Sequence, residues 1–362
     1  MLPHGTVNIG NLSRLRGVLE KTCKGNEITI GFIGGSITQG SLATKEENCY
    51  AFRVYQWLEK KFPLSKVNYV NAGIGATTSQ YGVARVNRDL LVHRPDIVFV
   101  EFSVNDEANI FFEETYEGIL RNILNDCTDP FVVIINNMFY NNGRNAQEFH
   151  NRIGREYEIP IVSMKDSIYN DIKEGKIKAS DVTPDMLHPN DSGHELVAEK
   201  ITLFLEYLFE EAKYSFEGYR MIMPITKNRF QYSKILNNVN LKISGTGFLA
   251  DNKKKKGITD IFKTGWLATK KGDFFEVNIE GSYFAVQYRK TIQKPAPVCR
   301  LLIDDFEEII LDGNFCENWG DCLYLQTLAY GLENRTHNIR VEVIEVDPNS
   351  KTPFYLAAFI VG

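Results

Sequence analysis

One serine in this chain stands where a nucleophile could act. Ser36 follows two glycines in the segment GGSITQG, residues 34–40, directly after an apolar run. Glycines before a serine let the backbone turn sharply and let a substrate approach. A serine hydroxyl is a weak nucleophile at its free pKa, so Ser36 needs a base within hydrogen-bond distance. The alternative is a serine that only caps a helix. The surrounding residues fit neither a phosphate-binding loop nor the GxSxG elbow.

A histidine with an aspartate three positions earlier occurs twice. Asp185 can reach one imidazole nitrogen of His188 within a single turn and hold its tautomer, which leaves the other nitrogen as a base. Asp191 instead stands where a helix N-cap is expected, and His194 falls in the first helical turn. We therefore predict His188, and not His194, as the base. The other histidines have no acidic partner at a telling spacing and are interpreted as surface or packing residues: His4, His93, His150 and His337.

Two more segments place a glycine and an asparagine after apolar runs. Gly75 lies in VNAGIGATTS, residues 70–79, and Asn105 lies in EFSVND, residues 101–106. Each segment alone is weak evidence, because such turns are common in loops. Their order along the chain, with the serine before them and Asp-x-x-His after them, is far more specific.

This order of a Ser, a Gly, an Asn and an Asp-x-x-His resembles the SGNH, or GDSL-like, hydrolases over residues 28–210. The resemblance assigns the nucleophile Ser36, the acid and base Asp185 and His188, and the oxyanion donors Gly75 and Asn105, together with the Ser36 N–H. Two departures reshape the pocket wall without removing a catalytic group. The first block reads GGSI where the family name implies Gly-Asp-Ser-Leu, and Ser103 stands where many members have glycine.

The four segments with the candidate site residues are far apart in sequence, so the fold must bring them together at one edge of a sheet. Up to about residue 210, apolar runs alternate with amphipathic stretches, which is typical of a parallel sheet covered on both faces. The expected strands are Ile28–Gly34, Val67–Ala72, Ile97–Phe102, Phe131–Asn136 and Ile159–Val162, and the expected helices lie near Tyr50–Phe62, Gln80–Leu91, Tyr116–Leu124, Ala146–Tyr157 and Ser192–Glu211. Open α/β sheets carry their sites at the carboxyl ends of strands. We predict a three-layer, flavodoxin-like SGNH hydrolase domain over residues 1–212.

After Tyr214 the pattern changes to short alternating runs, such as 274–279 and 283–288, with Gly, Asp and Asn turns between the runs. It predicts an antiparallel β-sandwich of the jelly-roll kind over residues 213–362. This domain resembles carbohydrate-binding modules attached to bacterial polysaccharide deacetylases. Trp319, in the polar loop NFCENWGD, has the setting of a residue that stacks on a sugar ring, the alternative being a buried sandwich residue. Trp266 has core-like neighbours and is expected to be structural.

The composition excludes several classes of protein. Hydrophobic residues make up 43% and charged residues 24%, which describes an ordinary globular chain and not a disordered one. With a net charge of −5, neither nucleic acid nor membrane is expected as a partner. The six cysteines lack metal-ligand spacing, so we expect reduced thiols, no metal and no cofactor. The N-terminal segment does not have the pattern of a signal peptide, which predicts a cytoplasmic location.

The function that these features favour is a serine esterase for O-acetyl esters. The two-domain order resembles bacterial acetylesterases that act on mannan or xylan oligosaccharides, so an acetylated oligosaccharide is the expected partner. A lipid esterase would need an apolar acyl groove, whereas the loops after Ser36, Gly75 and Asn105 are polar. A glycan-binding protein built on a catalytically inactive hydrolase fold would lack one or more triad residues, whereas this sequence has all three. The sequence does not determine the oligomeric state.

Overall fold

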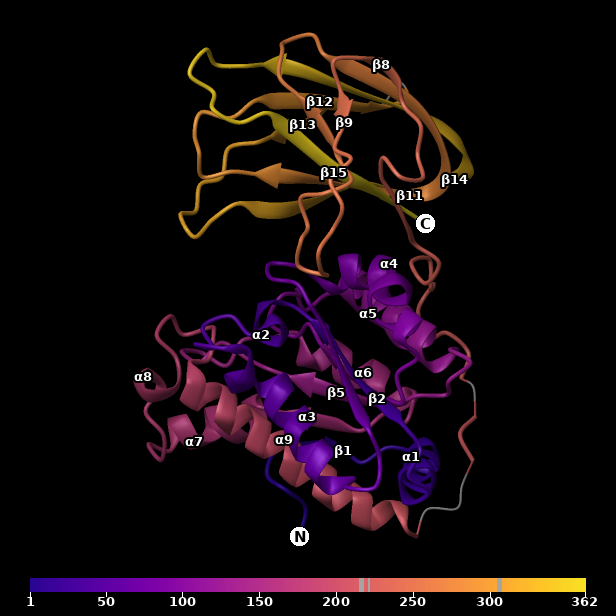
Figure 1. Cartoon of the computed structure of the whole chain (residues 1–362), viewed down its shortest axis with the longest axis vertical. Coiled ribbons are helices and arrows are strands. Elements are labelled where there is room, and N and C mark those ends of the chain that lie inside the picture. The colour runs from indigo at the N-terminus through magenta and orange to yellow at the C-terminus, as the bar shows by residue number, and fades with distance from the viewer. Residues whose placement is uncertain (215–217, 221, 305–307) are drawn as a thin grey trace. The chain divides into compact units, whose positions relative to one another are not determined.

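The chain forms two compact units. The structure is a computed structural model that describes residues 1–214, 218–220, 222–304 and 308–362. Unit 1 is Met1–Gln231 and unit 2 is Tyr232–Gly362 (Figure 1). Each unit has its own hydrophobic core. The boundary predicted after residue 212 coincides with the end of the last helix of unit 1, but the compact unit continues to Gln231.

Unit 1 is a sheet with helices on both faces. Among the described residues the strand order is β1-β6-β5-β4-β2-β3, with β1 antiparallel to β6 and the other pairs parallel. The strands are β1 (Thr6–Asn8), β2 (Ile28–Gly34), β3 (Val67–Gly73), β4 (Ile97–Glu101), β5 (Phe131–Asn136) and β6 (Ile161–Ser163). This order confirms the predicted α/β class.

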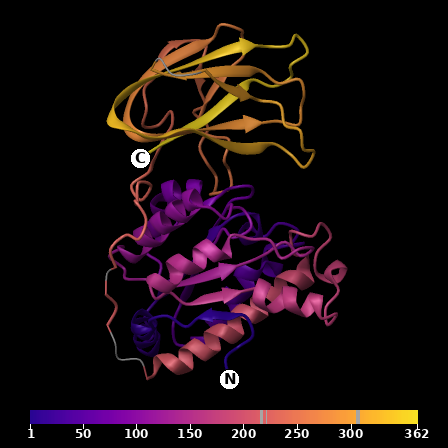
Figure 2. The same ribbon diagram turned by 180° about the vertical axis from the view of Figure 1, so that it is seen from behind.

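The helices of unit 1 form the two outer layers. They are α1 (Ser13–Cys23), α2 (Ser36–Gln39), α3 (Tyr50–Lys61), α4 (Ser79–Asp89), α5 (Ile110–Leu124), α6 (Gln147–Glu156), α7 (Asn170–Lys173), α8 (Ala179–Val182) and α9 (Asp191–Ala212), with short turns η1 (Glu46–Asn48), η2 (Leu91–His93) and η3 (Lys165–Tyr169). Helices α1, α3 and α9 pack together on one face, and α4, α5 and α6 pack together on the other (Figures 1 and 2).

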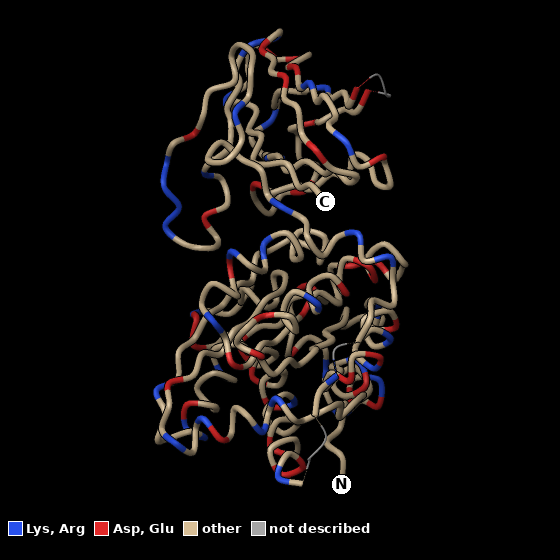
Figure 3. Tube along the Cα trace, turned by 90° about the vertical axis from the view of Figure 1, so that its right-hand side faces the viewer, with Lys and Arg blue, Asp and Glu red and all other residues tan. Residues whose placement is uncertain are grey.

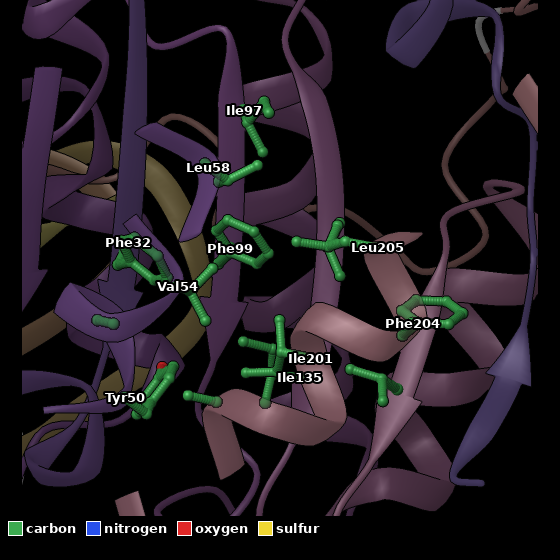
Figure 4. Packing of buried hydrophobic residues seen from close by; sticks show 14 of the residues in the cluster. Phe32, Tyr50, Val54, Leu58, Ile97, Phe99, Ile135, Ile201, Phe204 and Leu205 are labelled. Carbon is green, nitrogen blue, oxygen red and sulfur yellow. The ribbon is translucent and has the colours of Figure 1, made fainter. Parts of the chain in front are cut away.

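The core between the sheet and α3 and α9 is built from apolar residues at helical and strand spacing. Phe32 of β2 stacks on Phe99 of β4, with ring centroids 4.6 Å apart. Figure 4 shows Val54 and Leu58 of α3 and Ile201 and Leu205 of α9 around these rings. Every residue of β4 is buried, which agrees with a central parallel strand covered on both sides.

Two of the long helices of unit 1, α5 and α9, begin after an asparagine cap. α5 begins at Ile110, earlier than expected, because the Asn109 side chain accepts hydrogen bonds from the N–H groups of Phe111 and Phe112 at 3.0 and 3.1 Å. At α9 the cap is Asn190, whose side chain accepts from the Gly193 N–H at 3.0 Å, and Asp191 is the first residue of the helix instead of its cap.

Unit 2 is the predicted antiparallel β-sandwich. Its strands are β7 (Lys234–Leu236), β8 (Ser244–Thr246), β9 (Leu249–Ala250), β10 (Trp266–Ala268), β11 (Phe274–Lys290), β12 (Val298–Ile303), β13 (Ile309–Asp312), β14 (Cys322–Glu345) and β15 (Phe354–Val361). In the described residues their order is β13-β12-β14-β11-β15-β10-β9, with β7 on β15 and β8 on β11. The basic run 253–256 lies in an exposed irregular loop, which is seen as a continuous blue stretch in Figure 3.

Two long strands replace the short runs expected in unit 2. Residues 274–279 and 283–288 were predicted as separate strands, but both belong to β11. The first half of β11 pairs with the end of β14 and the second half with its beginning and with β15. The register shifts between Gly281 and Tyr283, and an irregularity of this kind bends a strand without interrupting it.

Two buried carboxylates of α5, Glu117 and Glu114, bind the segment that follows α9. Glu117 of α5 accepts hydrogen bonds from the N–H groups of Ile225 and Thr226 at 2.7 and 2.9 Å and from the Tyr157 hydroxyl at 2.6 Å. Arg229 pairs with Glu114 at 2.7 Å one turn earlier on the same helix. These contacts explain why unit 1 extends beyond its last helix.

We expect Glu117→Ala to destabilise unit 1 by about 3 kcal/mol, because buried donors lose a charged acceptor. Urea unfolding followed by the helical circular dichroism signal measures this loss. Glu199→Ala, at an exposed position on α9, is the matched control and should change stability by less than about 0.5 kcal/mol. Equal effects of both substitutions would contradict this role of Glu117.

Candidate active site

The predicted nucleophile lies at the carboxyl end of β2. Ser36 is the first residue of α2 and is 7% exposed. Its Oγ lies 2.8 Å from Nε2 of His188, although the two residues are 152 positions apart. The two preceding glycines are required by space. A Cβ at Gly34 would lie 2.4 Å from the Glu101 carbonyl oxygen, and one at Gly35 would lie 2.1 Å from Oδ1 of Asn105.

The predicted acid and base are joined in the turn before α9. Nδ1 of His188 lies 2.7 Å from Oδ2 of Asp185, and Oδ1 of Asp185 accepts from the N–H groups of Leu187 and His188 at 2.9 and 2.7 Å. Met186 adopts a left-handed conformation, φ 64°, which closes the turn. Burial raises the pKa of Asp185, but the hydrogen bonds from His188 and the backbone outweigh it, so the pKa is lowered overall. The carboxylate is therefore ionised beside the imidazole.

The two predicted oxyanion donors lie against the same turn. A Cβ built on Gly75 would lie 3.7 Å from Cβ of Ser36, and the Asn105 carboxamide packs against Gly35. The structure thus gathers the four sequence blocks at one edge of the sheet. In the structure the Gly75 N–H donates to Oε1 of Gln39 at 2.5 Å. In the sequence, Gln39 is marked only as one of the polar residues of the loop after Ser36.

A buried arginine connects the strand ends that carry Ser36 and Gly75. Arg85 of α4 is fully buried and donates to the carbonyl oxygens of Ala72 and Gly34 at 2.6 and 3.1 Å. The Ile74 N–H also donates to the Gly34 carbonyl, at 3.1 Å. Burial lowers the pKa of Arg85, while the nearby carboxylate of Asp89 opposes this change. Arg85 is a positioning residue for the turn that contains the nucleophile.

A second buried pair supports the Asn105 loop. His150 has no acidic partner at a telling spacing in the sequence, but in the fold its Nε2 lies 3.0 Å from Oδ2 of Asp106, and both side chains are fully buried. Oδ1 of Asp106 accepts from the Ser79 N–H at 2.8 Å, at the start of α4. The His150 ring also stacks on Tyr116, with centroids 3.7 Å apart. Asp106 therefore joins the Asn105 loop to the helix that follows Gly75.

A buried glutamate stands at the end of β4, beside Gly34. Burial raises the pKa of Glu101 to about 7, against the lowering effect of the Ser103 hydroxyl and N–H, which donate to Oε1 at 2.9 and 3.1 Å. Ser103, one of the departures from the family pattern, thus has a structural role here. Its hydroxyl also lies 2.9 Å from the Asn137 carbonyl oxygen.

The second Asp-x-x-His is structural. His194 is buried, its Nδ1 accepts from the Tyr50 N–H at 3.3 Å, and its Nε2 faces the Ser41 carbonyl at 3.2 Å. Burial lowers the pKa of His194 to about 4, so it is neutral near pH 7. Asp191 holds the loop before α3 through Thr44, whose N–H and hydroxyl donate to it at 2.8 and 2.6 Å. His188 lies within hydrogen-bond distance of Ser36, whereas both ring nitrogens of His194 face backbone groups.

The described residues offer no obvious site for a metal. No group of three or more His, Cys, Asp or Glu side chains in these ranges is arranged to hold one. The cysteines at 23, 49, 127, 299, 316 and 322, all of them described, are free thiols. Across the described residues, none of the helices combines the length and apolar character that a bilayer crossing needs.

Comparison with known proteins gives the family. Residues 32–196 match the model of the GDSL-like Lipase/Acylhydrolase family. The thioesterase 1/protease 1/lysophospholipase L1 of Escherichia coli (strain K12) is 29% identical over 143 residues, and the match spans 37% of this chain and 65% of that relative. The acetylxylan esterase of Geobacillus stearothermophilus is 25% identical over 197 residues, which cover 46% of this chain and 89% of that relative.

A solved structure matches both units. It is a two-domain esterase (CEX) active on acetylated mannans, co-crystallized with mannopentaose. It is 46% identical with a TM-score of 0.94, and the match covers 99% of this chain and 96% of that chain. The chain belongs to the GDSL-like lipase/acylhydrolase family. This confirms the predicted family and two-domain architecture, and the family and these esterase relatives support the predicted class, a carboxylic ester hydrolase.

Substitutions of the two candidate bases, His188 and His194, should have different effects. His188→Ala should lower kcat for p-nitrophenyl acetate by at least ~10³-fold, because Ser36 loses its hydrogen-bonded base. His194→Ala should leave kcat within about threefold but destabilise unit 1 by about 2 kcal/mol, since it removes a buried ring and its partners. Steady-state kinetics and urea unfolding of both variants test this assignment. The opposite ranking in kcat would show that His194 is the base.

Proposed function

We propose that this chain is a serine esterase that removes O-acetyl groups from mannan- or xylan-derived oligosaccharides. The observation that carries the proposal is the continuous hydrogen-bond chain from Ser36 through His188 to Asp185, at 2.8 and 2.7 Å. A serine hydroxyl, an imidazole and an ionised carboxylate in this order are the groups that acyl transfer requires. Gly75 and Asn105 lie close to the turn that carries Ser36, after the carboxyl ends of the neighbouring strands β3 and β4.

Acylation follows from this geometry. The Ser36 Oγ attacks the acetyl carbonyl carbon while Nε2 of His188 accepts the hydroxyl proton. Asp185 holds Nδ1 of His188 and stabilises the imidazolium that forms. The negative charge that develops on the acyl oxygen is stabilised by the N–H groups of Ser36 and Gly75 and by the Asn105 carboxamide. His188 then returns its proton to the departing sugar oxygen, which leaves an acetyl group on Ser36.

Deacylation uses the same groups with water as the nucleophile. His188 accepts a proton from water, the resulting oxygen attacks the acetyl carbonyl, and a second tetrahedral intermediate forms in the same oxyanion site. Its collapse releases acetate and returns the proton to Ser36. The neutral His194 takes no part, because both of its nitrogens have backbone partners.

The substrate class is supported by a relative and by the polarity of the loops. The two-domain esterase that is 46% identical over nearly the whole chain is active on acetylated mannans, and a more distant relative is an acetylxylan esterase. The loops beside Ser36 carry exposed polar residues such as Gln39 and Glu107. A lipid esterase, which the lysophospholipase relative suggests, would place an apolar groove there. The predicted cytoplasmic location and the absence of nucleic-acid and membrane partners stay predictions.

Unit 2 carries the residue proposed to contact sugar. Trp319 is 58% exposed, so the alternative of a buried sandwich residue does not hold. Its ring meets the largely buried Phe315 edge-on, with centroids 5.0 Å apart, which supports the exposed face of the indole. Asp321 anchors the same loop by accepting from the Thr291 hydroxyl at 2.6 Å. Trp266, by contrast, is 2% exposed in the core, as predicted.

Ser36→Ala should abolish acetate release from acetylated mannan and xylan oligosaccharides while leaving the melting temperature nearly unchanged, because a hydroxyl at a sheet edge contributes little to packing. We expect the wild-type protein to hydrolyse p-nitrophenyl acetate much faster than the octanoate. Acetate release and chromogenic assays measure both. Residual activity above a few per cent in the variant would exclude Ser36 as nucleophile, and a preference for octanoate would favour a lipid substrate.

Trp319→Ala should raise KM for acetylated oligosaccharides by about tenfold and barely change hydrolysis of p-nitrophenyl acetate, because only the former offers a sugar ring for stacking. Tyr330→Ala, which removes another exposed aromatic ring of unit 2, is the matched control. Equal losses of Trp319→Ala on both substrates would point to a packing role. An unchanged KM for the oligosaccharides would place Trp319 outside the binding site.

A further inference from the structure

The oxyanion donor Gly75 already has a hydrogen-bond partner. Oε1 of Gln39 accepts its N–H at 2.5 Å. Gln39 is the last residue of α2, so the occupying oxygen comes from the helix that Ser36 begins. A Cβ at Gly75 would lie 3.0 Å from this oxygen and 3.7 Å from Cβ of Ser36. The carboxamide oxygen and the nucleophile therefore flank the same glycine.

The backbone on both sides of this hydrogen bond is held in place. The Gln39 N–H donates to the Gly35 carbonyl at 3.0 Å. On the other side, the Ile74 N–H donates to the Gly34 carbonyl, and the Thr77 hydroxyl donates to the Ile74 carbonyl at 2.6 Å. The Gln39 side chain is exposed and has rotatable bonds of its own. The side chain is thus the part that can move away.

An acyl oxygen and the Gln39 oxygen compete for the same proton. The carbonyl oxygen of a carboxamide accepts an N–H in the same way as the carbonyl oxygen of an ester, and a backbone amide has only one hydrogen to donate. An ester that places its acyl oxygen on Gly75 must displace Oε1 of Gln39. The developing oxyanion, being charged, is the stronger acceptor and wins this competition in the transition state.

We propose that Gln39 is a displaceable occupant of the oxyanion hole, which fills the Gly75 donor in the free enzyme and lowers the apparent reactivity toward esters. This inference rests on the proposed esterase function. It assigns Gln39 a role opposite to that of a positioning residue. A residue that holds the Gly75 turn in its active shape would be needed for activity, whereas an occupant is inhibitory.

Three substitutions of Gln39 separate these roles. Gln39→Met retains the length of the side chain and replaces the carboxamide oxygen with a thioether, a much weaker acceptor, whereas Gln39→Ala removes both the length and the acceptor. Each should raise kcat/KM for p-nitrophenyl acetate by about 2- to 10-fold, the range that the net strength of one neutral hydrogen bond gives. Gln39→Glu should lower kcat/KM at pH 7 by about 10-fold or more, because a carboxylate accepts the N–H more strongly and repels the oxyanion.

The control is Asn26→Ala, which removes an exposed carboxamide just before β2, at the opposite end of that strand, and should leave kcat/KM unchanged. Thermal melting of all the variants checks that they fold. A fall or no change in kcat/KM for Gln39→Met overturns the inference, as does a gain in Gln39→Ala alone, which would reflect added space. If the wild-type protein does not hydrolyse p-nitrophenyl acetate or the acetylated oligosaccharides, the proposed function fails and the inference fails with it.

Discussion

The site depends on the close approach of the carboxyl ends of β2 and β3, which the buried guanidinium of Arg85 holds together. Its two hydrogen bonds end on carbonyl oxygens directly before the turns that carry Ser36 and Gly75. Parallel pairing places Gly34 opposite Gly73 on one side and opposite Glu101 on the other, so three strands end at one level. Without the guanidinium, those carbonyl groups would lose buried donors, and the relation of the nucleophile to its oxyanion donor would be free to change.

The surroundings of each titratable group near the site also decide whether that group is charged near pH 7. Asp185 keeps its charge because several donors surround it, although burial opposes this. His194 loses its charge because burial dominates, and Glu101 is held partly neutral near pH 7 for the same reason. Of two Asp-x-x-His segments with identical spacing, one therefore presents an accessible imidazole to Ser36 and the other supports the fold. The Asp-x-x-His spacing identifies both histidines as candidate bases, and the burial of each imidazole decides which role it has.

Gln39, Asp106 and His150 show what sequence patterns do not reveal. Asp106 and His150 are 44 positions apart, and Gly75 and Gln39 are 36 apart, so no local spacing relates them. The aspartate next to Asn105 and the glutamine three residues after Ser36 were visible as polar loop residues. Their partners follow only from the packing of α6 under the Asn105 loop and of α2 beside the Gly75 turn. The buried Asp106–His150 pair satisfies polar groups in a region that excludes water, whereas the hydrogen bond between Gly75 and Gln39 lies at the exposed edge of the site.

The sequence by itself determined the α/β class of unit 1 and the sandwich class of unit 2, because the periodicity of apolar residues is a local property of the chain. It also determined the site candidates, because the order of the four polar blocks can be read along the chain: Ser36, Gly75, Asn105, Asp185 and His188. It did not determine that residues 274–279 and 283–288 form one strand, since a bulge and a turn have similar local patterns. It also left open the exposure of Trp319, and it placed the end of the first domain at residue 212, whereas the compact unit continues to Gln231. The tertiary structure decided these points, because burial, hydrogen-bond partners and the resulting pKa values depend on segments that are distant in sequence and adjacent only after folding.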